Sequence, residues 1–264
     1  MTHMNEENRY KAIFFDVDGT LLSHSINDIP PSTLKALNAL HEKGILLIIA
    51  SGRHLSELKE LPLHNYHFDA YITQTGQICY DKDFQTIFKD PIGREDTRIL
   101  VEAFESMEIP IVLLNERELY INYVDDYVIK VQSSINTAIP EIGTYNGEDL
   151  YGATVFGDTE SINGLVSRLK GCKRSFWHNS ASDIILSSAG KVKGIEAVMK
   201  YFDLKQDETM AFGDEDNDLD MIAYVKTGIV MGNGSDNMKK IADYITESVD
   251  NNGIYNAVRY YGLI

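Results

Sequence analysis

The sequence is poor in positive charge, in cysteine and in long apolar runs. Its 24 lysines and arginines stand against 40 aspartates and glutamates, which gives a formal net charge of −16 at pH 7. Because nucleic-acid backbones are bound by clustered lysine and arginine, this charge argues against a nucleic-acid partner. An anionic substrate would need a local positive site or a metal ion.

The two cysteines, Cys79 and Cys172, lack the spacing of a metal site. Buried free thiols in a reducing compartment are the simplest account of them. No stretch approaches the roughly 20 apolar residues of a membrane helix, and Met1–Lys11 has no signal-peptide apolar run. The sequence therefore predicts a soluble, cytoplasmic protein with no membrane partner.

What is present is the pattern of an α/β protein. Lys11–Phe15 and Ile45–Ala50 are short, continuous apolar segments, which is typical of strands buried on both faces of a parallel sheet. Leucines at helical spacing lie between them and predict a helix that ends near Gly44. The same pattern of short apolar segments recurs at Thr209–Phe212 and Gly228–Met231. We expect a Rossmann-like, doubly wound core with helices on both faces of a parallel sheet.

The middle of the chain has a different texture. Short alternating segments lie at residues 84–88, 111–114, 119–123 and 153–156, and helical stretches at 95–107 and 160–169. Alternation predicts an antiparallel sheet with one face covered by helices. The sequence thus predicts two domains, a core of residues 1–81 and 188–264 and an inserted α+β domain of residues 82–187.

Three polar clusters follow predicted parallel strands, where open α/β sheets bind their ligands. They are Asp16–Thr20 (DVDGT), Ser51–Arg53 (SGR) and Gly213–Asp218 (GDEDND). A fourth feature, Lys193, opens the helix that precedes the third cluster. Converging carboxylates imply a hard cation with oxygen ligands, and a phosphate substrate favours magnesium.

These residue types suit phosphoryl transfer through a covalent intermediate. Asp16 would be the nucleophile and form an acyl phosphate. Lys193 and Ser51, together with magnesium, would neutralise and hold the transferring oxygens. Asp18 would protonate the leaving oxygen and then deprotonate the water that hydrolyses the intermediate.

Each feature taken alone has a simpler interpretation. The first cluster reads as a turn, the second as a helix N-cap, and Lys193 as a solvated surface lysine. The third reads as an acidic turn or a calcium loop. A calcium loop that starts at Asp214 requires glycine at its sixth position and glutamate at its twelfth, and those positions are Leu219 and Val225. The occurrence of all four features in order favours the phosphatase interpretation.

Together the four features resemble the motifs of the haloacid dehalogenase superfamily, and within it the Cof-type (subfamily IIB) sugar-phosphate phosphatases. The matching segments are Asp16–Thr20, Ser51–Arg53, Gly190–Gly194 and Gly213–Asp218, with further similarity at 230–233, 242–246 and 252–253. The resemblance covers essentially the whole chain. Two departures are Ser51, where the family more often has threonine, and Thr75-Gly76, where it usually has Asn-Gly.

The resemblance implies a role for each matched residue. The implied ligands of Mg²⁺ are the carboxylates of Asp16 and Asp214, the backbone carbonyl of Asp18, and Asp218 directly or through water. The implied phosphate-binding residues are Ser51, Gly52, Lys193 and Asn217. The inserted domain would be a C2B-type cap that closes over the core, excludes water and reads the leaving group. Candidate residues for the substrate or cap are Arg53, Tyr120 and Trp177, although ordinary cap packing is the simpler account of the two aromatic ones.

The predicted function is Mg²⁺-dependent hydrolysis of a small phosphorylated metabolite, with a sugar phosphate as the expected class. The reaction would pass through an aspartyl phosphate on Asp16. One alternative is a phosphotransferase that uses the same intermediate. The other is a non-catalytic binding or regulatory protein on the same scaffold, which a missing nucleophile, acid, lysine or metal ligand would favour. None of these residues is missing from the motifs.

Overall fold

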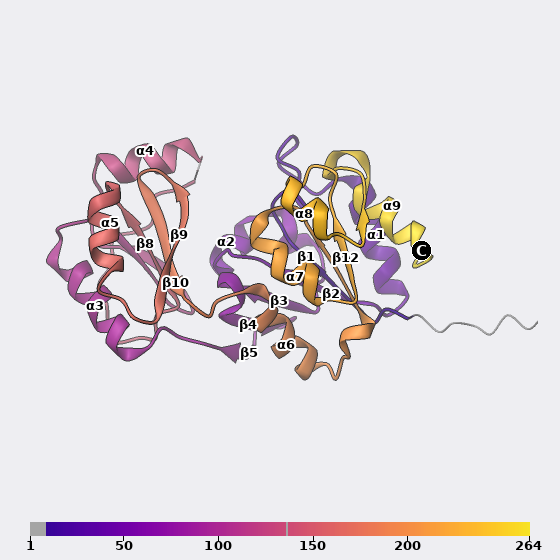
Figure 1. Cartoon of the computed structure of the whole chain (residues 1–264), viewed down its shortest axis with the longest axis horizontal. Helices are drawn as coiled ribbons and strands as arrows, with labels where there is room; N and C mark the ends of the chain where they lie inside the picture. Colours follow the sequence, from indigo (N-terminus) through magenta and orange to yellow (C-terminus); the bar gives the residue numbers. More distant parts are fainter. Residues whose placement is uncertain (1–8, 136) are drawn as a thin grey trace, which may run out of the picture. The chain divides into compact units, whose positions relative to one another are not determined.

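The computed structural model describes residues 9–135 and 137–264. They form two compact units (Figure 1). The first comprises the chain up to Arg53 together with Glu57–Lys89 and Gly190–Ile264, and the second comprises His54–Ser56 and Asp90–Ala189. Most of Met1–Lys11, the segment in which the sequence predicts no signal peptide, lies outside the described residues. Within the described residues, no helix has the length and apolar character that crossing a membrane requires.

The first unit is built on a sheet of eight strands in the order β13-β12-β11-β1-β2-β3-β4-β5. The strands are β1 (Ala12–Phe15), β2 (Leu46–Ala50), β3 (Ala70–Thr73), β4 (Ile78–Asp81), β5 (Thr86–Lys89), β11 (Thr209–Gly213), β12 (Thr227–Val230) and β13 (Tyr244–Ile245). The run from β13 to β3 is parallel, whereas β4 and β5 are antiparallel. The chain therefore winds outward from β1 in one direction and from β11 in the other, which confirms the doubly wound α/β core.

Helices cover both faces of this sheet. The helical elements of the unit are α1 (Pro31–Glu42), η1 (Pro62–Asn65), η2 (Gln74–Gly76), α6 (Lys191–Tyr201), η3 (Gln206–Glu208), η4 (Asp216–Asp218), α7 (Leu219–Tyr224), α8 (Asp236–Ile241), η5 (Val249–Asn251) and α9 (Gly253–Tyr260). A further helix, α2 (Leu55–Glu60), begins within the short segment that clusters with the second unit.

Strand β1 shows why the apolar runs are continuous. Ile13 and Phe15 pack into the cluster that α1 and α9 complete, whereas Ala12 and Phe14 pack into the cluster that α6 and α7 complete. All four side chains are fully buried. Because both faces of the strand are covered, neither face carries a polar residue.

Helix α1 begins and ends where its sequence indicates. Pro31 occupies its first turn, where a missing N–H leaves no hydrogen bond unmade. Gly44 follows its end with φ +72°, and its N–H donates to the carbonyl of His41 while that of Ile45 donates to Leu40. This left-handed turn directs the chain into β2.

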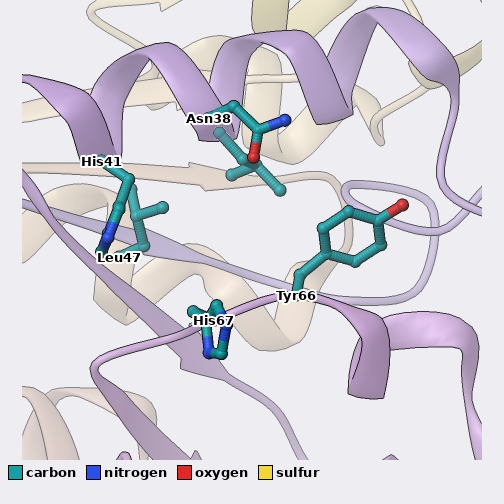
Figure 2. Close-up of a pocket in the computed structure, with 6 residues that line it drawn as sticks. Asn38, His41, Leu47, Tyr66 and His67 are labelled. Atoms are coloured by element: carbon teal, nitrogen blue, oxygen red, sulfur yellow. The ribbon is translucent and has the colours of Figure 1, made fainter.

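A hollow of about 310 Å³ lies between α1 and the segment that follows η1 (Figure 2). Its lining residues are Leu37, Asn38, His41, Leu47, Tyr66 and His67. This lining contains neither carboxylates nor lysines and none of the motif residues. The hollow is therefore distinct from the place where the motifs predict phosphate chemistry.

The second unit is an antiparallel sheet with the order β7-β6-β8-β10-β9. Its elements are α3 (Arg94–Ser106), β6 (Ile111–Leu114), β7 (Leu119–Ile121), α4 (Asp126–Ser134), β8 (Gly152–Phe156), α5 (Thr159–Val166), β9 (Cys172–His178) and β10 (Ala181–Leu186). Helices α3 and α5 cover one face, as expected. The sequence did not predict α4, which packs Val128 and Val131 against Val112 and Phe156 on the other face.

The boundaries of the insertion differ from those predicted. Segment 84–88, which was expected to open the inserted domain, contributes β5 to the core sheet, where Ile78 of β4 pairs with Lys89. The chain therefore leaves the core after Lys89 instead of after residue 81, and returns at Gly190 instead of residue 188. Alternation did not reveal this, because an edge strand of the core is half exposed in the same way as a cap strand.

Candidate active site

Neighbouring parallel strands bring the first and last motifs together. Strand β1 ends at Phe15 and β11 ends at Gly213, so Asp16 and Asp214 both leave the sheet at the carboxyl ends of adjacent strands. The N–H of Asp16 still donates to the carbonyl of Phe212, at 3.0 Å. This edge lies between β1 and β11, where the winding direction of the sheet reverses and open α/β sheets bind their ligands.

Asp218 joins the two aspartates through the short helix η4. Its Oδ2 accepts the backbone N–H groups of Asp214, at 3.1 Å, and Glu215, at 3.3 Å. Asp16, Asp214 and Asp218 are all buried, and each offers one oxygen within 4.8 Å of the others. Three carboxylates thus converge on one small volume.

The side chain of Lys191 brings a positive charge to this cluster. Its Nζ donates to Asp16 Oδ1 at 2.6 Å and also to Asp218 Oδ1, and the side chain is fully buried. The motif pattern of the sequence predicts this role for Lys193. The structure differs because the two lysines stand two positions apart on α6, about 200° around a helix of 3.6 residues per turn, and it is Lys191 whose side chain points to the aspartates.

The missed signal was the apolar stripe of α6. Its buried residues are Lys191, Gly194, Ile195, Val198 and Met199. This is the i, i+3, i+4, i+7, i+8 pattern of a helix face that packs on the core. Lys191 falls on that stripe and Lys193 does not, so the helical period alone could have identified the buried lysine.

Burial dominates the ionisation of the cluster. It raises the pKa of Asp16 to about 8, although the nearby ammonium of Lys191 opposes the shift. It also raises the pKa of Asp214 to about 7 against the hydrogen bond from Thr20. Burial alone would lower the pKa of Lys191, but the charges of Asp16 and Asp218 outweigh it and hold that pKa above its usual value. Lys191 therefore remains an ammonium, while burial shifts the pKa values of Asp16 and Asp214 upward.

The residues present suit a hard divalent cation. One ammonium cannot neutralise three ionised carboxylates in a buried site. Carboxylate oxygens at this mutual spacing are the ligands that Mg²⁺ and Ca²⁺ prefer. Gly19, at φ +80°, leaves room for the carboxylate of Asp214, because a Cβ at position 19 would lie 2.1 Å from Asp214 Oδ2. The donor set therefore fits a metal ion such as magnesium.

Asp18 is held by Arg53. The guanidinium Nε donates to Asp18 Oδ2 at 2.7 Å and Nη2 donates to Oδ1 at 2.9 Å. Both side chains are about one-third exposed, at 34% and 33%. A two-pronged contact of this kind is among the stronger ion pairs. The sequence predicts Arg53 as a candidate contact for the substrate or cap, and in this structure it binds the predicted acid, Asp18.

The other predicted phosphate-binding residues lie at the carboxyl ends of the strands. Ser51 follows β2 and is buried, and its Oγ accepts the N–H of Arg53 at 3.2 Å. The carbonyl of Ser51 accepts the N–H of Thr75 at 3.2 Å, and Thr75 has φ +54°. Gly52 and Asn217 are exposed, and their contact with phosphate remains a prediction.

The two cap candidates have different environments. Tyr120 is buried in the apolar cluster of the second unit, packs edge-to-face on Phe104 at 5.7 Å, and donates its hydroxyl to Glu148. It is a packing residue, so the structure does not offer its ring to a ligand. Trp177 lies on the edge strand β9 and is 38% exposed. Its contact with substrate remains a prediction.

Comparison with known proteins agrees with this geometry. A family profile described as haloacid dehalogenase-like hydrolase matches residues 13–258. The Bacillus subtilis (strain 168) protein YkrA, whose name marks it as a candidate phosphatase, is 32% identical over 96% of this chain and 98% of its own length. YitU of the same organism, a 5-amino-6-(5-phospho-D-ribitylamino)uracil phosphatase, is 25% identical over 97% and 98%. The solved structure of the subclass IIB sugar phosphatase BT4131 is 30% identical, covers 96% of this chain and 100% of its own, and gives a TM-score of 0.79.

The chain belongs to the haloacid dehalogenase-like hydrolases. Its fold, its cluster of buried acidic residues and its phosphatase relatives identify it as a phosphoric monoester hydrolase of the Cof type.

Replacing Lys191 and Lys193 of α6 in turn tests which of the two belongs to the site. Lys191→Met should lower the free energy of unfolding in chelator by about 3–5 kcal/mol, because Asp16 and Asp218 lose their buried counter-ion. It should also abolish inhibition by inorganic phosphate. The matched Lys193→Met should change stability by less than about 1 kcal/mol and leave that inhibition intact. Urea unfolding and inhibition assays measure both effects, and the reverse ranking would contradict the assignment.

A second pair of variants tests the cap aromatics. Tyr120→Ala should destabilise the protein by about 3–5 kcal/mol, because it opens a cavity under α3. Trp177→Ala should cost less than about 1 kcal/mol, since the ring stands at an exposed edge. Thermal and urea unfolding give the comparison. Equal losses in the two variants would show that Trp177 is also a packing residue.

Proposed function

We propose that the chain hydrolyses a small phosphorylated metabolite, of the sugar-phosphate class, through an aspartyl phosphate on Asp16 and with Mg²⁺ as cofactor. The observation that carries the proposal is the contact of Lys191 with Asp16 and Asp218 beside Asp214. Buried carboxylates with a fixed ammonium form a site made for a phosphate and a cation.

Asp16 is suited to act as the nucleophile. Its carboxylate stands at the end of β1, and Lys191 fixes one of its oxygens. The carboxylates of Asp16, Asp214 and Asp218 and the carbonyl of Asp18 would hold the metal. When bound, Mg²⁺ supplies charge neutralisation at the phosphoryl oxygens. Ser51, Gly52 and Asn217 would hold the remaining phosphoryl oxygens.

The reaction balances in two displacements. In the first, an oxygen of Asp16 bonds to phosphorus, the bond to the leaving oxygen breaks, and Asp18 gives that oxygen a proton. In the second, Asp18 takes a proton from water as the water oxygen bonds to phosphorus and the bond to Asp16 breaks. Alcohol and inorganic phosphate are released, and both aspartates return to their starting state.

Arg53 has to release Asp18 before the first step. Both oxygens of Asp18 accept from the guanidinium, so the carboxyl group is engaged as long as this pair is intact. A phosphate group offers Arg53 an alternative two-pronged partner. Substrate binding would thereby free Asp18 and recruit Arg53 to the anion, so that the acid becomes available only with substrate present.

The relatives support the substrate class. BT4131 is described as a sugar phosphatase, and the name of YitU specifies an ester of a ribityl chain. Both descriptions refer to phosphate esters of polyhydroxylated carbon chains. We assign selection among such esters to the inserted unit as a cap, with Trp177 as a candidate contact, and place the reaction in the cytoplasm.

The test is hydrolysis of a chromogenic phosphate monoester with Mg²⁺, with chelator, and by two variants. Asp16→Asn should abolish turnover, and Asp18→Asn should slow it by about 10²-fold or more, because each removes one partner of the two displacements. Chelator should abolish the activity of the wild-type protein. Residual turnover in Asp16→Asn would rule out the covalent route, and a loss in Asp18→Asn confined to KM would contradict its role as acid and base.

A further inference from the structure

Asn233 joins three segments that lie far apart in the sequence. Its Nδ2 donates to the carbonyl of Gly19 at 2.9 Å and to Asp214 Oδ2 at 3.2 Å. Its Oδ1 accepts the N–H of Val249, the first residue of η5, at 2.9 Å. One side chain thus connects the loop after β1, the loop after β11 and the segment after β13.

The contact with Asp214 matters because this carboxylate is fixed from two sides. Thr20 Oγ1 donates to Asp214 Oδ1 at 3.0 Å, while Asn233 donates to Oδ2. Gly19 lies close to this amide, since a Cβ at position 19 would lie 3.3 Å from Asn233 Nδ2. The plane and rotation of the carboxylate are therefore set by neutral donors, which bring no charge that would repel a cation.

A donor on a carboxylate does not prevent that carboxylate from binding a metal. Each carboxylate has about four lone-pair positions, so an oxygen that accepts from Asn233 or Thr20 can also face a cation. Hydrogen bonds of this type hold metal ligands in the orientation that the metal requires.

We propose that Asn233 is a positioning residue that orients Asp214 for the divalent cation. The inference rests on the proposed function, because it takes Asp214 to be a metal ligand. Asn233 is exposed and lies in the turn after β12, and its hydrogen bond to Asp214 Oδ2 is the contact through which it would act.

The test measures Mg²⁺ binding through the rise in Tm that the ion causes in metal-free protein, which needs no catalytic readout. Asn233→Ala should raise the Kd for Mg²⁺ by about 10–100-fold, and saturating Mg²⁺ should restore most of kcat. The matched control is Asn237→Ala. Asn237 is also exposed and its Nδ2 donates to a carboxylate, that of Asp216, at 3.0 Å, but Asp216 lies outside the cluster, so the Kd should stay at the wild-type value.

Asn233→Leu provides a second variant in case the alanine variant folds poorly. It keeps a side chain of similar size and removes both donations of Nδ2 without adding a charge. The Kd for Mg²⁺ should rise here as well. A Kd equal to or below that of the wild type in both variants at position 233 would overturn the proposal.

The outcomes separate the inference from the function on which it rests. If Mg²⁺ does not stabilise the wild-type protein, the metal-dependent function and the inference both fail. If Mg²⁺ stabilises the wild type and both variants at position 233 with the same Kd, only the role of Asn233 fails. An equal loss of affinity in Asn237→Ala would show that the effect is not specific to Asp214, and would also overturn the inference.

Discussion

The structure of the site depends on one buried ammonium. Transferring a charge from water into a protein interior costs several kcal/mol, and only well-placed opposite charges offset it. Lys191 contacts both Asp16 and Asp218, so the start of α6, the end of β1 and the turn after β11 must meet at one point. The parallel pairing of β1 with β11, with Phe15 opposite Phe212, brings these segments together.

The same interaction explains how a strongly acidic protein can accept an anion. With a net charge of −16, the average field of the molecule repels phosphate. At the carboxyl edge of the core sheet, Lys191 and Arg53 supply positive charge close to the aspartates. Three carboxylates still outnumber the ammonium that contacts two of them, and a dication resolves that imbalance while adding a further contact for phosphate. In the proposed function, the acidic cluster would thus bind phosphate through a metal.

Much of this architecture could be predicted from the sequence because it rests on local pattern. Continuous apolar runs such as Ile45–Ala50 report burial on both faces of a strand, and Asp16 and Asp214 follow such runs directly.

Predictions failed where a residue fitted a sequence pattern but its place in the fold differs from the one that the pattern implies. Lys193 matched a motif, but the helical period places Lys191 on the buried stripe of α6. Residues 84–88 alternate like a cap strand, although hydrogen bonding to β4 makes them an edge of the core. Tyr120 is polar enough to suggest a ligand, and its hydroxyl is taken by Glu148. Hydrogen bonds between distant segments, such as those of Asn233, left no periodic signal.

The central claim is that the buried carboxylates form a site for one divalent cation. Titration calorimetry of Mg²⁺ into metal-free protein, near neutral pH and in two buffers of different ionisation enthalpy, tests it most directly. Because burial raises the pKa of Asp16 to about 8 and that of Asp214 to about 7, we expect the ion to displace protons as it binds. The account predicts one Mg²⁺ per chain, with a heat that differs between the buffers by the released protons. Absence of Mg²⁺ binding would contradict the central claim, and equal heats in both buffers would contradict the raised pKa values of Asp16 and Asp214.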